Sequence, residues 1–155
     1  MNAISVVKVT HHFNASPERV FDAWLDPKTA GKWLFATPTG VMVRVEIDAR
    51  IGGRFVIVDR RDGEDVEHTG EYLEIDRPRR LVFTFGVPKY SPLFTKVTVG
   101  IEPAASGCDL TLIQENVPAE YLGRNEKGWI GTLTGLADYI AEYVKEHVEF
   151  VAEII

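Results

Sequence analysis

The residue types best suited to acid–base chemistry gather between His68 and Tyr72. On a strand, side chains two positions apart point to the same face, so His68, Gly70 and Tyr72 should share one face. A histidine there could act as a general base or as a hydrogen-bonding group inside a pocket. A strand-end or core histidine is the simpler interpretation. We therefore include His68 among the candidate ligand-binding residues and assign no residue to catalysis.

Two further polar residues, Glu71 and Gln114, could orient a ligand if their strand faces turn inward, and a surface position agrees equally well with the sequence. His11 and His12 are adjacent on a predicted strand, so their side chains point to opposite faces and cannot share one metal ion. We therefore expect no metal site and no cofactor.

The sequence lacks the common nucleophile and phosphate-binding motifs. It contains no Gly-x-Ser-x-Gly turn, no phosphate loop ending in Gly-Lys-Ser or Gly-Lys-Thr, and no Gly-x-Gly-x-x-Gly turn. Cys108 is the only cysteine, which excludes an intramolecular disulfide. The negative charge of the adjacent Asp109 should raise the pKa of the Cys108 thiol, so we expect this residue to pack in a strand without reacting.

Apolar side chains from separate segments are a stronger indication of a site. A long helix packed on a sheet would bring them around one space, where they could fill the core or line an apolar pocket. The candidate ligand-binding residues are Trp33, Phe35, Phe55, Ile57, His68, Tyr72, Phe83, Phe85, Gln114, Trp129, Leu133 and Leu136.

The charge balance argues against nucleic-acid binding, which depends on clustered basic side chains. The 155 residues include 17 Lys and Arg against 23 Asp and Glu, a net charge of −6. Short basic runs at Arg60–Arg61 and at 77–80 adjoin turn signals and are interpreted as solvated strand ends, with contact to an anion or a partner as the alternative. No secretion signal and no apolar run of membrane-spanning length is present. We expect a cytoplasmic protein with a single domain over residues 1–155.

Hydrophobic periodicity predicts a first strand, two short helices, about six further strands and a long final helix. The first strand runs from Ile4 to Phe13, Ser16-Pro17 begins the first helix, and Asp26-Pro27 begins the second, which runs through Trp33. Helices on one face of an antiparallel sheet make this an α+β domain.

The alternation after residue 40 predicts strands with one buried face. The first of these should bury Val41, Val43, Val45 and Ile47, and the next carries Phe55 and Ile57. The remaining strands are predicted at roughly 68–75, 81–85, 94–101 and 108–115.

The final helix carries one apolar stripe at the helical period. We expect this stripe to lie on the sheet; its members are Trp129, Leu133, Leu136, Ile140 and Val144.

Three glycines in the same helix, Gly128, Gly131 and Gly135, lie by angle on its polar side. They should therefore not widen the pocket directly. Close approach of the loop at 88–92 or of a second subunit would explain them, as would a frayed start of the helix.

Several segments together resemble the START-like, helix-grip superfamily, also called SRPBCC. Within it, the chain is most similar to bacterial homologues of the activator of heat-shock protein 90 ATPase. The segments that carry the resemblance, which covers nearly the whole chain, are residues 14–24 (NASPERVFDAW), Lys32-Trp33, residues 68–75 (HTGEYLEI), Pro78, residues 81–85 (LVFTF) and Gly128-Trp129.

The resemblance implies a curved, seven-stranded antiparallel sheet wrapped round a long C-terminal helix, with two short helices after the first strand. It also implies an apolar cavity, which in relatives holds lipids, polyketides or aromatic compounds. Chaperone activation is not implied, because the eukaryotic activators carry an additional N-terminal domain that is missing from this sequence.

We expect a non-enzymatic protein that binds a small apolar or aromatic molecule between the sheet and the final helix. The second hypothesis is a cyclase- or hydrolase-type enzyme that uses His68 or Glu71 as acid or base. The third is a module that interacts with a chaperone. A second copy of the chain is a further candidate partner.

Overall fold

The helices and strands follow the order predicted from the sequence. The structure, a computed structural model, describes the backbone of residues 4–154 and the side chains of residues 5–143. Within residues 4–154, no helix is both long and apolar enough to cross a membrane. The elements are β1 (Ile4–Phe13), α1 (Pro17–Ala23), η1 (Ala30–Lys32), β2 (Val41–Ile47), β3 (Arg54–Arg61), β4 (Glu64–Asp76), β5 (Arg80–Phe85), β6 (Thr95–Pro103), β7 (Cys108–Pro118), η2 (Ala119–Tyr121) and α2 (Leu122–Ile154).

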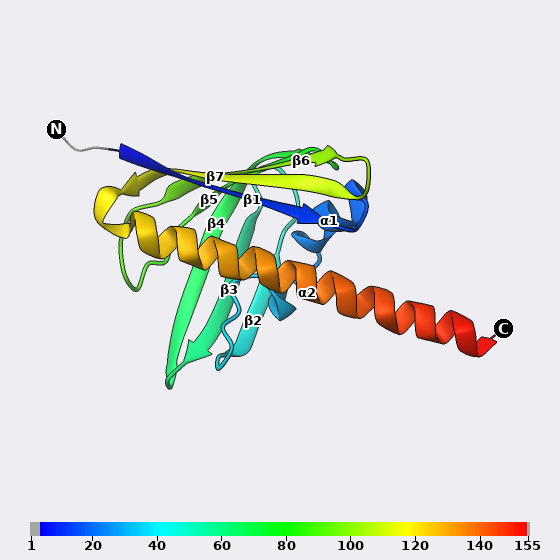
Figure 1. Cartoon of the computed structure of the whole chain (residues 1–155). Helices are drawn as coiled ribbons and strands as arrows, with labels where there is room; N and C mark the ends of the chain where they lie inside the picture. Colours follow the sequence, from blue (N-terminus) through cyan, green and yellow to red (C-terminus); the bar gives the residue numbers. More distant parts are fainter. Residues whose placement is uncertain (1–3, 155) are drawn as a thin grey trace.

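The seven strands form one antiparallel sheet in the order β1-β7-β6-β5-β4-β3-β2. Strands β2 to β7 pair with their neighbours in sequence, and β1 returns beside β7, where Val9 lies opposite Leu112. Figure 1 shows the long helix α2 crossing one face of this sheet, with α1 at one end of β1. The predicted α+β, helix-grip architecture is confirmed.

The side chain of Ser16 begins the first short helix, α1, as predicted. Ser16 Oγ accepts a hydrogen bond from the backbone N–H of Arg19 at 3.2 Å, and Pro17 is the first residue of α1. Asp26 accepts a hydrogen bond from the backbone N–H of Lys28 at 2.9 Å, ahead of η1. The second helix, η1, is a single 3-10 turn that begins at Ala30 without a side-chain cap. The prediction that Asp26-Pro27 begins it is therefore wrong, because Asp26 holds a turn that precedes the helix.

The alternation predicted for β2 is wrong at its start. Val41 and Val43 are exposed, whereas Met42 packs against the core together with Val45 and Ile47. The register of β2 against β3 shifts just after Met42, which indicates a bulge that reverses the faces of the strand. The sheet order makes β2 an edge strand, where bulges are common.

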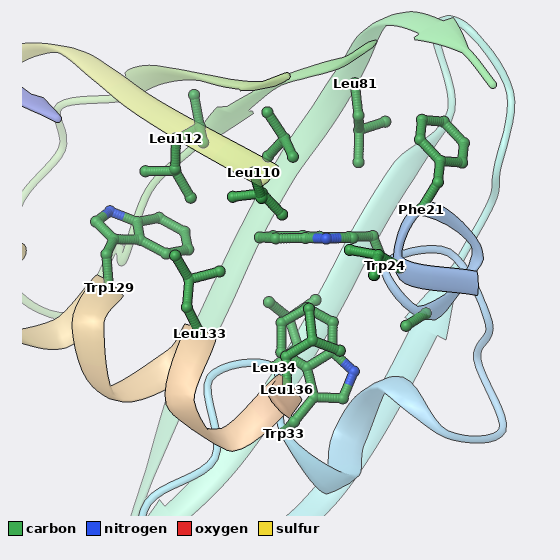
Figure 2. Packing of buried hydrophobic residues seen from close by; sticks show 14 of the residues in the cluster. Phe21, Trp24, Trp33, Leu34, Leu81, Leu110, Leu112, Trp129, Leu133 and Leu136 are labelled. Atoms are coloured by element: carbon green, nitrogen blue, oxygen red, sulfur yellow. The ribbon is translucent and has the colours of Figure 1, made fainter. Parts of the chain in front are cut away.

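The apolar stripe of α2 is buried as predicted over its described part. Trp129, Leu133, Leu136 and Ile140 are at most 5% exposed, and Figure 2 shows Trp129 and Leu133 pointing from α2 toward the strands. The side chain of Val144 lies outside the described residues.

Two tryptophans from the short helices fill the space between α2 and the sheet. Trp24 follows α1 and Trp33 follows η1, and their rings meet edge to face with centroids 4.8 Å apart at 85° (Figure 2). The Trp24 ring also lies 6.2 Å from Phe83 on β5 and 6.5 Å from Trp129 on α2. The core is therefore continuous from the short helices through to the sheet and to the long helix.

Candidate functional site

An open cavity of about 320 Å³ lies at the first turns of α2, where this helix meets the segments that follow η1 and β5. Its volume is at the lower end of the range of small-molecule pockets, about 300–1,000 Å³. Phe35, Phe85 and Trp129 supply its large apolar side chains. The rest of its lining is Ala36, Thr37, Arg61, His68, Val87, Tyr90, Arg124, Asn125, Gly128 and Thr132.

Stacked rings form one wall of the cavity. Phe35 stacks on His68, with centroids 4.7 Å apart at 2°, and on Phe85, at 5.0 Å and 3°. Trp129 meets Phe35 edge to face at 5.9 Å and 61°. Phe35 also lines a small space of about 10 Å³ among core residues, so it contributes to both the open cavity and the core. An apolar molecule in the cavity would contact these aromatic rings.

Phe35 holds a left-handed backbone conformation with φ of 59°. This conformation is uncommon for a bulky residue and costs on the order of 1–3 kcal/mol. The stacking of its ring and a hydrogen bond from Arg61 Nη2 to its carbonyl oxygen, at 3.3 Å, hold it in place. Strained residues cluster at ligand-binding sites, which agrees with the position of Phe35 in the cavity wall.

His68 is 5% exposed, and both of its ring nitrogens have partners within the protein. Nδ1 lies 3.2 Å from the carbonyl oxygen of Ile57, and Nε2 lies 3.3 Å from Nη2 of Arg61. A carbonyl only accepts and a guanidinium only donates, so these partners assign the neutral tautomer with its proton on Nδ1. Burial, with a smaller contribution from the charge of Arg61, lowers the pKa of His68 to about 4. His68 is therefore neutral near pH 7.

His68 should make the protein less stable as the pH falls from 6.5 to about 4. In this interval the unfolded chain binds a proton at residue 68 and the folded chain does not, so acid favours unfolding. We expect His68→Gln to flatten the decline of the urea-unfolding free energy in this interval, by up to about 3 kcal/mol.

The pKa of His68 is measured directly from its ring resonances by NMR, with the exposed His12 as internal comparison. A hydrogen bond to Asp109 raises the pKa of His12, so His12 should be protonated at a higher pH than His68. Titration of His68 at or above its ordinary value, or equal slopes for the wild type and His68→Gln, would contradict this assignment.

Arg61 links the cavity wall to a buried carboxylate. Its Nε donates to Oδ2 of Asp59 at 2.7 Å, and the Thr37 hydroxyl donates to the same oxygen at 2.9 Å. Asp59 is 1% exposed. The interpretation of Arg60–Arg61 as a solvated strand end is therefore wrong for Arg61, because alternation turns its side chain inward with Asp59. It is confirmed for Arg60, which pairs with Asp65 at the surface at 2.8 Å.

A chain of hydrogen bonds joins α2 to the sheet beside the cavity. Trp129 Nε1 donates to Oε1 of Gln114 at 2.9 Å, and Gln114 Nε2 donates to the Thr95 hydroxyl at 2.9 Å. The Thr95 hydroxyl donates to the Phe85 carbonyl oxygen at 3.1 Å. Gln114 is 1% exposed, and its buried amide thus has partners at both ends. These hydrogen bonds fix the orientation of the Trp129 ring in the cavity wall.

A second hollow of about 310 Å³ adjoins the open cavity. Its rim includes Leu93 and Tyr121, which are 59% and 37% exposed, and Gln114 lies in its lining. The residues that line both hollows are Phe85, Val87, Tyr90, Arg124 and Asn125.

The structure distributes the candidate ligand-binding residues over three places. Phe35, His68, Phe85 and Trp129 line the open cavity, and Gln114 lines the adjoining hollow. The others pack in the core at 3% exposure or less: Trp33, Phe55, Ile57, Tyr72, Phe83, Leu133 and Leu136.

Glu71 lies apart from this site. Strand alternation turns its side chain to the face of β4 opposite His68 and Tyr72, which are both buried. Within residues 5–143, no group of three or more His, Cys, Asp or Glu side chains could hold a metal ion.

Sequence reasoning missed several residues that line the cavity: Arg61, Val87, Tyr90, Arg124 and Asn125. The inward position of Arg61 could have been found from the period of two that it shares with Asp59 on β3. The other four lie in a loop and at a helix start, where no local pattern indicates which segments will meet.

The expectation that the helix glycines leave the pocket unaffected is wrong for Gly128, which lines the open cavity. Val87 and Tyr90 line the same cavity, but a Cβ at Gly128 would meet no described atom within 4 Å, so close approach of the loop after β5 does not explain this glycine. A Cβ at Gly135 would make ordinary contact with Trp33 at 3.7 Å, and a Cβ at Gly131 would meet nothing within 4 Å. The three glycines therefore have separate surroundings.

The antiparallel sheet, the long closing helix and the short helices after β1 define a START-like domain of the helix-grip type. The family model described as Activator of Hsp90 ATPase homolog 1-like protein matches residues 14–141. The chain belongs to this family.

Solved structures of bacterial proteins agree with this assignment. A protein from Chromobacterium violaceum is 30% identical, with a TM-score of 0.78 over 86% of this chain and 95% of that one. A Staphylococcus aureus protein of unknown function is 18% identical, with a TM-score of 0.81 over 93% and 98%. An AHSA1-like protein from Aeromonas hydrophila is 20% identical, with a TM-score of 0.76 over 90% and 94%. The last two support the fold alone. No curated protein matches the chain.

Proposed function

We propose that this protein binds a small apolar or aromatic molecule in the open cavity at the start of α2. The observation that carries the proposal is that Phe35, Phe85 and Trp129 line one cavity of about 320 Å³, in which Phe85 is partly exposed. Burial of a ligand's apolar surface against these rings, about 25 cal/mol per Å², would supply most of the affinity.

The alternative of an acid–base enzyme finds no support at the two residues considered for it. His68 is neutral near pH 7, and Arg61 occupies the lone pair of its Nε2. Glu71 lies on the opposite face of β4 from His68, so the two side chains cannot act on one substrate. A binding function requires neither residue to accept a proton.

Gly128 allows a test that fills the cavity without disturbing the core. A Cβ at Gly128 would meet nothing within 4 Å, and the added side chain of Gly128→Leu would extend from the cavity lining. We expect this variant to bind the neutral fluorescent probe N-phenylnaphthylamine at least about tenfold more weakly than the wild type, a loss of about 1.4 kcal/mol. Fluorescence titration measures the affinity.

Gly131→Leu is the matched control. It makes the same change three residues later in the same helix, where the added side chain also meets open space but lines neither hollow. Both variants should keep or raise the melting temperature, since leucine favours a helix over glycine by roughly 0.8 kcal/mol. Equal binding by the two variants, or no saturable binding by the wild type, would refute the proposal.

We further propose that residues 1–155 act as one domain in the cytoplasm. Cys108 is buried and has no disulfide partner. Burial, with a smaller contribution from the charge of Asp109, raises the pKa of the Cys108 thiol. A free thiol of this kind suits a reducing compartment.

A further inference from the structure

We propose that the ligand of the open cavity is an amphiphilic anion, with an apolar or aromatic body and one acidic oxygen-bearing group such as a carboxylate or sulfonate. Arg124 at the cavity mouth would bind the acidic group. This inference rests on the proposed function of the same cavity and narrows it to one class of ligand.

The ionisable side chains of the cavity lining carry no negative charge. They are Arg61, His68, Arg124 and the phenol of Tyr90, and among residues 5–143 no carboxylate lines this cavity or the adjoining hollow. This is unexpected in a chain with a net charge of −6. His68 is neutral near pH 7, and Asp59 balances the charge of Arg61 from behind the wall. Arg124 therefore supplies the net positive charge of the site.

Arg124 is not engaged by a carboxylate in the described part of the chain. Its guanidinium lies 5.9 Å from the centroid of the Tyr121 ring, and no ion pair or hydrogen bond joins it to residues 5–143. Glu120, one helical turn earlier, lines neither hollow. Other arginines do form ion pairs with carboxylates: Arg44, Arg50, Arg60, Arg61, Arg77, Arg79 and Arg80.

The place of Arg124 on α2 is unfavourable for the helix itself. It lies in the first turn, which contains no acidic residue, and a positive charge there opposes the positive end of the helix dipole. A bound anion would offset the unfavourable interaction between Arg124 and the helix dipole, because the anion would interact favourably with both the guanidinium and the dipole.

The positions of the rings suit the rest of such a ligand. Arg124 lines both hollows, and Phe85 lines both as well, while Phe35 and Trp129 extend the apolar wall of the larger one. A ligand with its acidic group at Arg124 could therefore lay its apolar body on the rings. An uncharged ligand would leave the guanidinium unused, and a cationic one would be repelled.

Two probes that differ only in an acidic group test this inference. Anilinonaphthalene sulfonate and N-phenylnaphthylamine share one aromatic skeleton, and only the first carries a sulfonate. We expect the wild-type protein to bind the sulfonate about tenfold more tightly at low salt. Arg124→Gln should remove this advantage while it changes the affinity for the neutral probe less than about twofold, and Arg124→Lys should restore part of it.

Lys127→Gln is the control for net charge. Lys127 is exposed on the same helix and lines neither hollow. Its replacement by Gln removes one positive charge, as Arg124→Gln does. It should leave the affinities for both probes unchanged. Near-UV circular dichroism of each variant excludes sulfonate binding to partly unfolded chains.

The outcomes separate this inference from the proposed function. If the neutral probe binds and Gly128→Leu blocks it, but Arg124→Gln behaves like Lys127→Gln toward the sulfonate, the anion inference is wrong and the cavity proposal stands. Sulfonate binding that Gly128→Leu does not weaken would place that probe elsewhere and also overturn the inference. If neither probe binds the wild type, the proposed function itself fails.

Discussion

Gly70→Ala should lower the free energy of unfolding by about 3 kcal/mol or more. Gly70 lies on β4 between the buried His68 and Tyr72. A Cβ at this position would overlap the backbone carbonyl of Thr84 and would lie 2.8 Å from Cε1 of the Phe55 ring. A backbone carbonyl cannot rotate away as a flexible side chain can, so the strands themselves would have to separate.

Gly100→Ala is the matched control for Gly70→Ala. Gly100 lies on β6 of the same sheet, and in the described part of the chain a Cβ there would come within 4 Å of the carbonyl oxygen of Thr111 alone, at 3.9 Å. This variant should stay within roughly 1 kcal/mol of the wild type in urea unfolding, because alanine also restricts the unfolded chain. Equal losses in the two variants would show that overlap with the Thr84 carbonyl does not determine the cost of Gly70→Ala.

Arg61→Met should destabilise the protein by about 3–5 kcal/mol, the usual cost of removing one partner from a buried ion pair. The Asp59 carboxylate is 1% exposed, and its Oδ1 already lacks a hydrogen-bond partner among residues 5–143. Without Arg61, the charge would keep only the Thr37 hydroxyl as a donor. Methionine preserves most of the side-chain volume, so the decrease in unfolding free energy would measure the cost of leaving the Asp59 charge unpaired.

Asp59→Asn should cost less, about 1–2 kcal/mol. The Arg61 side chain is 32% exposed and can turn toward water, and asparagine can still accept from Thr37. The double variant with Arg61→Met should be more stable than Arg61→Met alone, because it removes the buried charge. Urea unfolding of the three variants measures this coupling. Additive losses would show that Asp59 and Arg61 do not act as a pair.

The order of elements could be predicted because it depends on local patterns. The stripe from Trp129 to Ile140 follows the helical period, and Ser16 carries the capping group that begins α1. The faces of β2 could not be predicted, because the bulge after Met42 depends on its pairing with β3.

The site was harder to predict, because its residues meet only in the folded chain. Helical angles assigned Gly128 to the polar side, yet the cavity opens on that side between α2 and the loop that carries Tyr90. The aromatic set does gather around α2, but the amount of open space depends on how tightly residues such as Trp24 and Trp33 fill the interior. Composition alone does not define that packing.

The hydrogen-bond chain from Trp129 to Phe85 divides the cavity walls into two kinds. Through Gln114 and Thr95, it fastens α2 to β7, β6 and β5. The lining also includes Tyr90, which is 64% exposed and belongs to the loop between β5 and β6. Substitutions in this loop can change which molecules fit while the anchored wall stays intact. The range of ligands and the stability of the fold can therefore evolve separately on this scaffold.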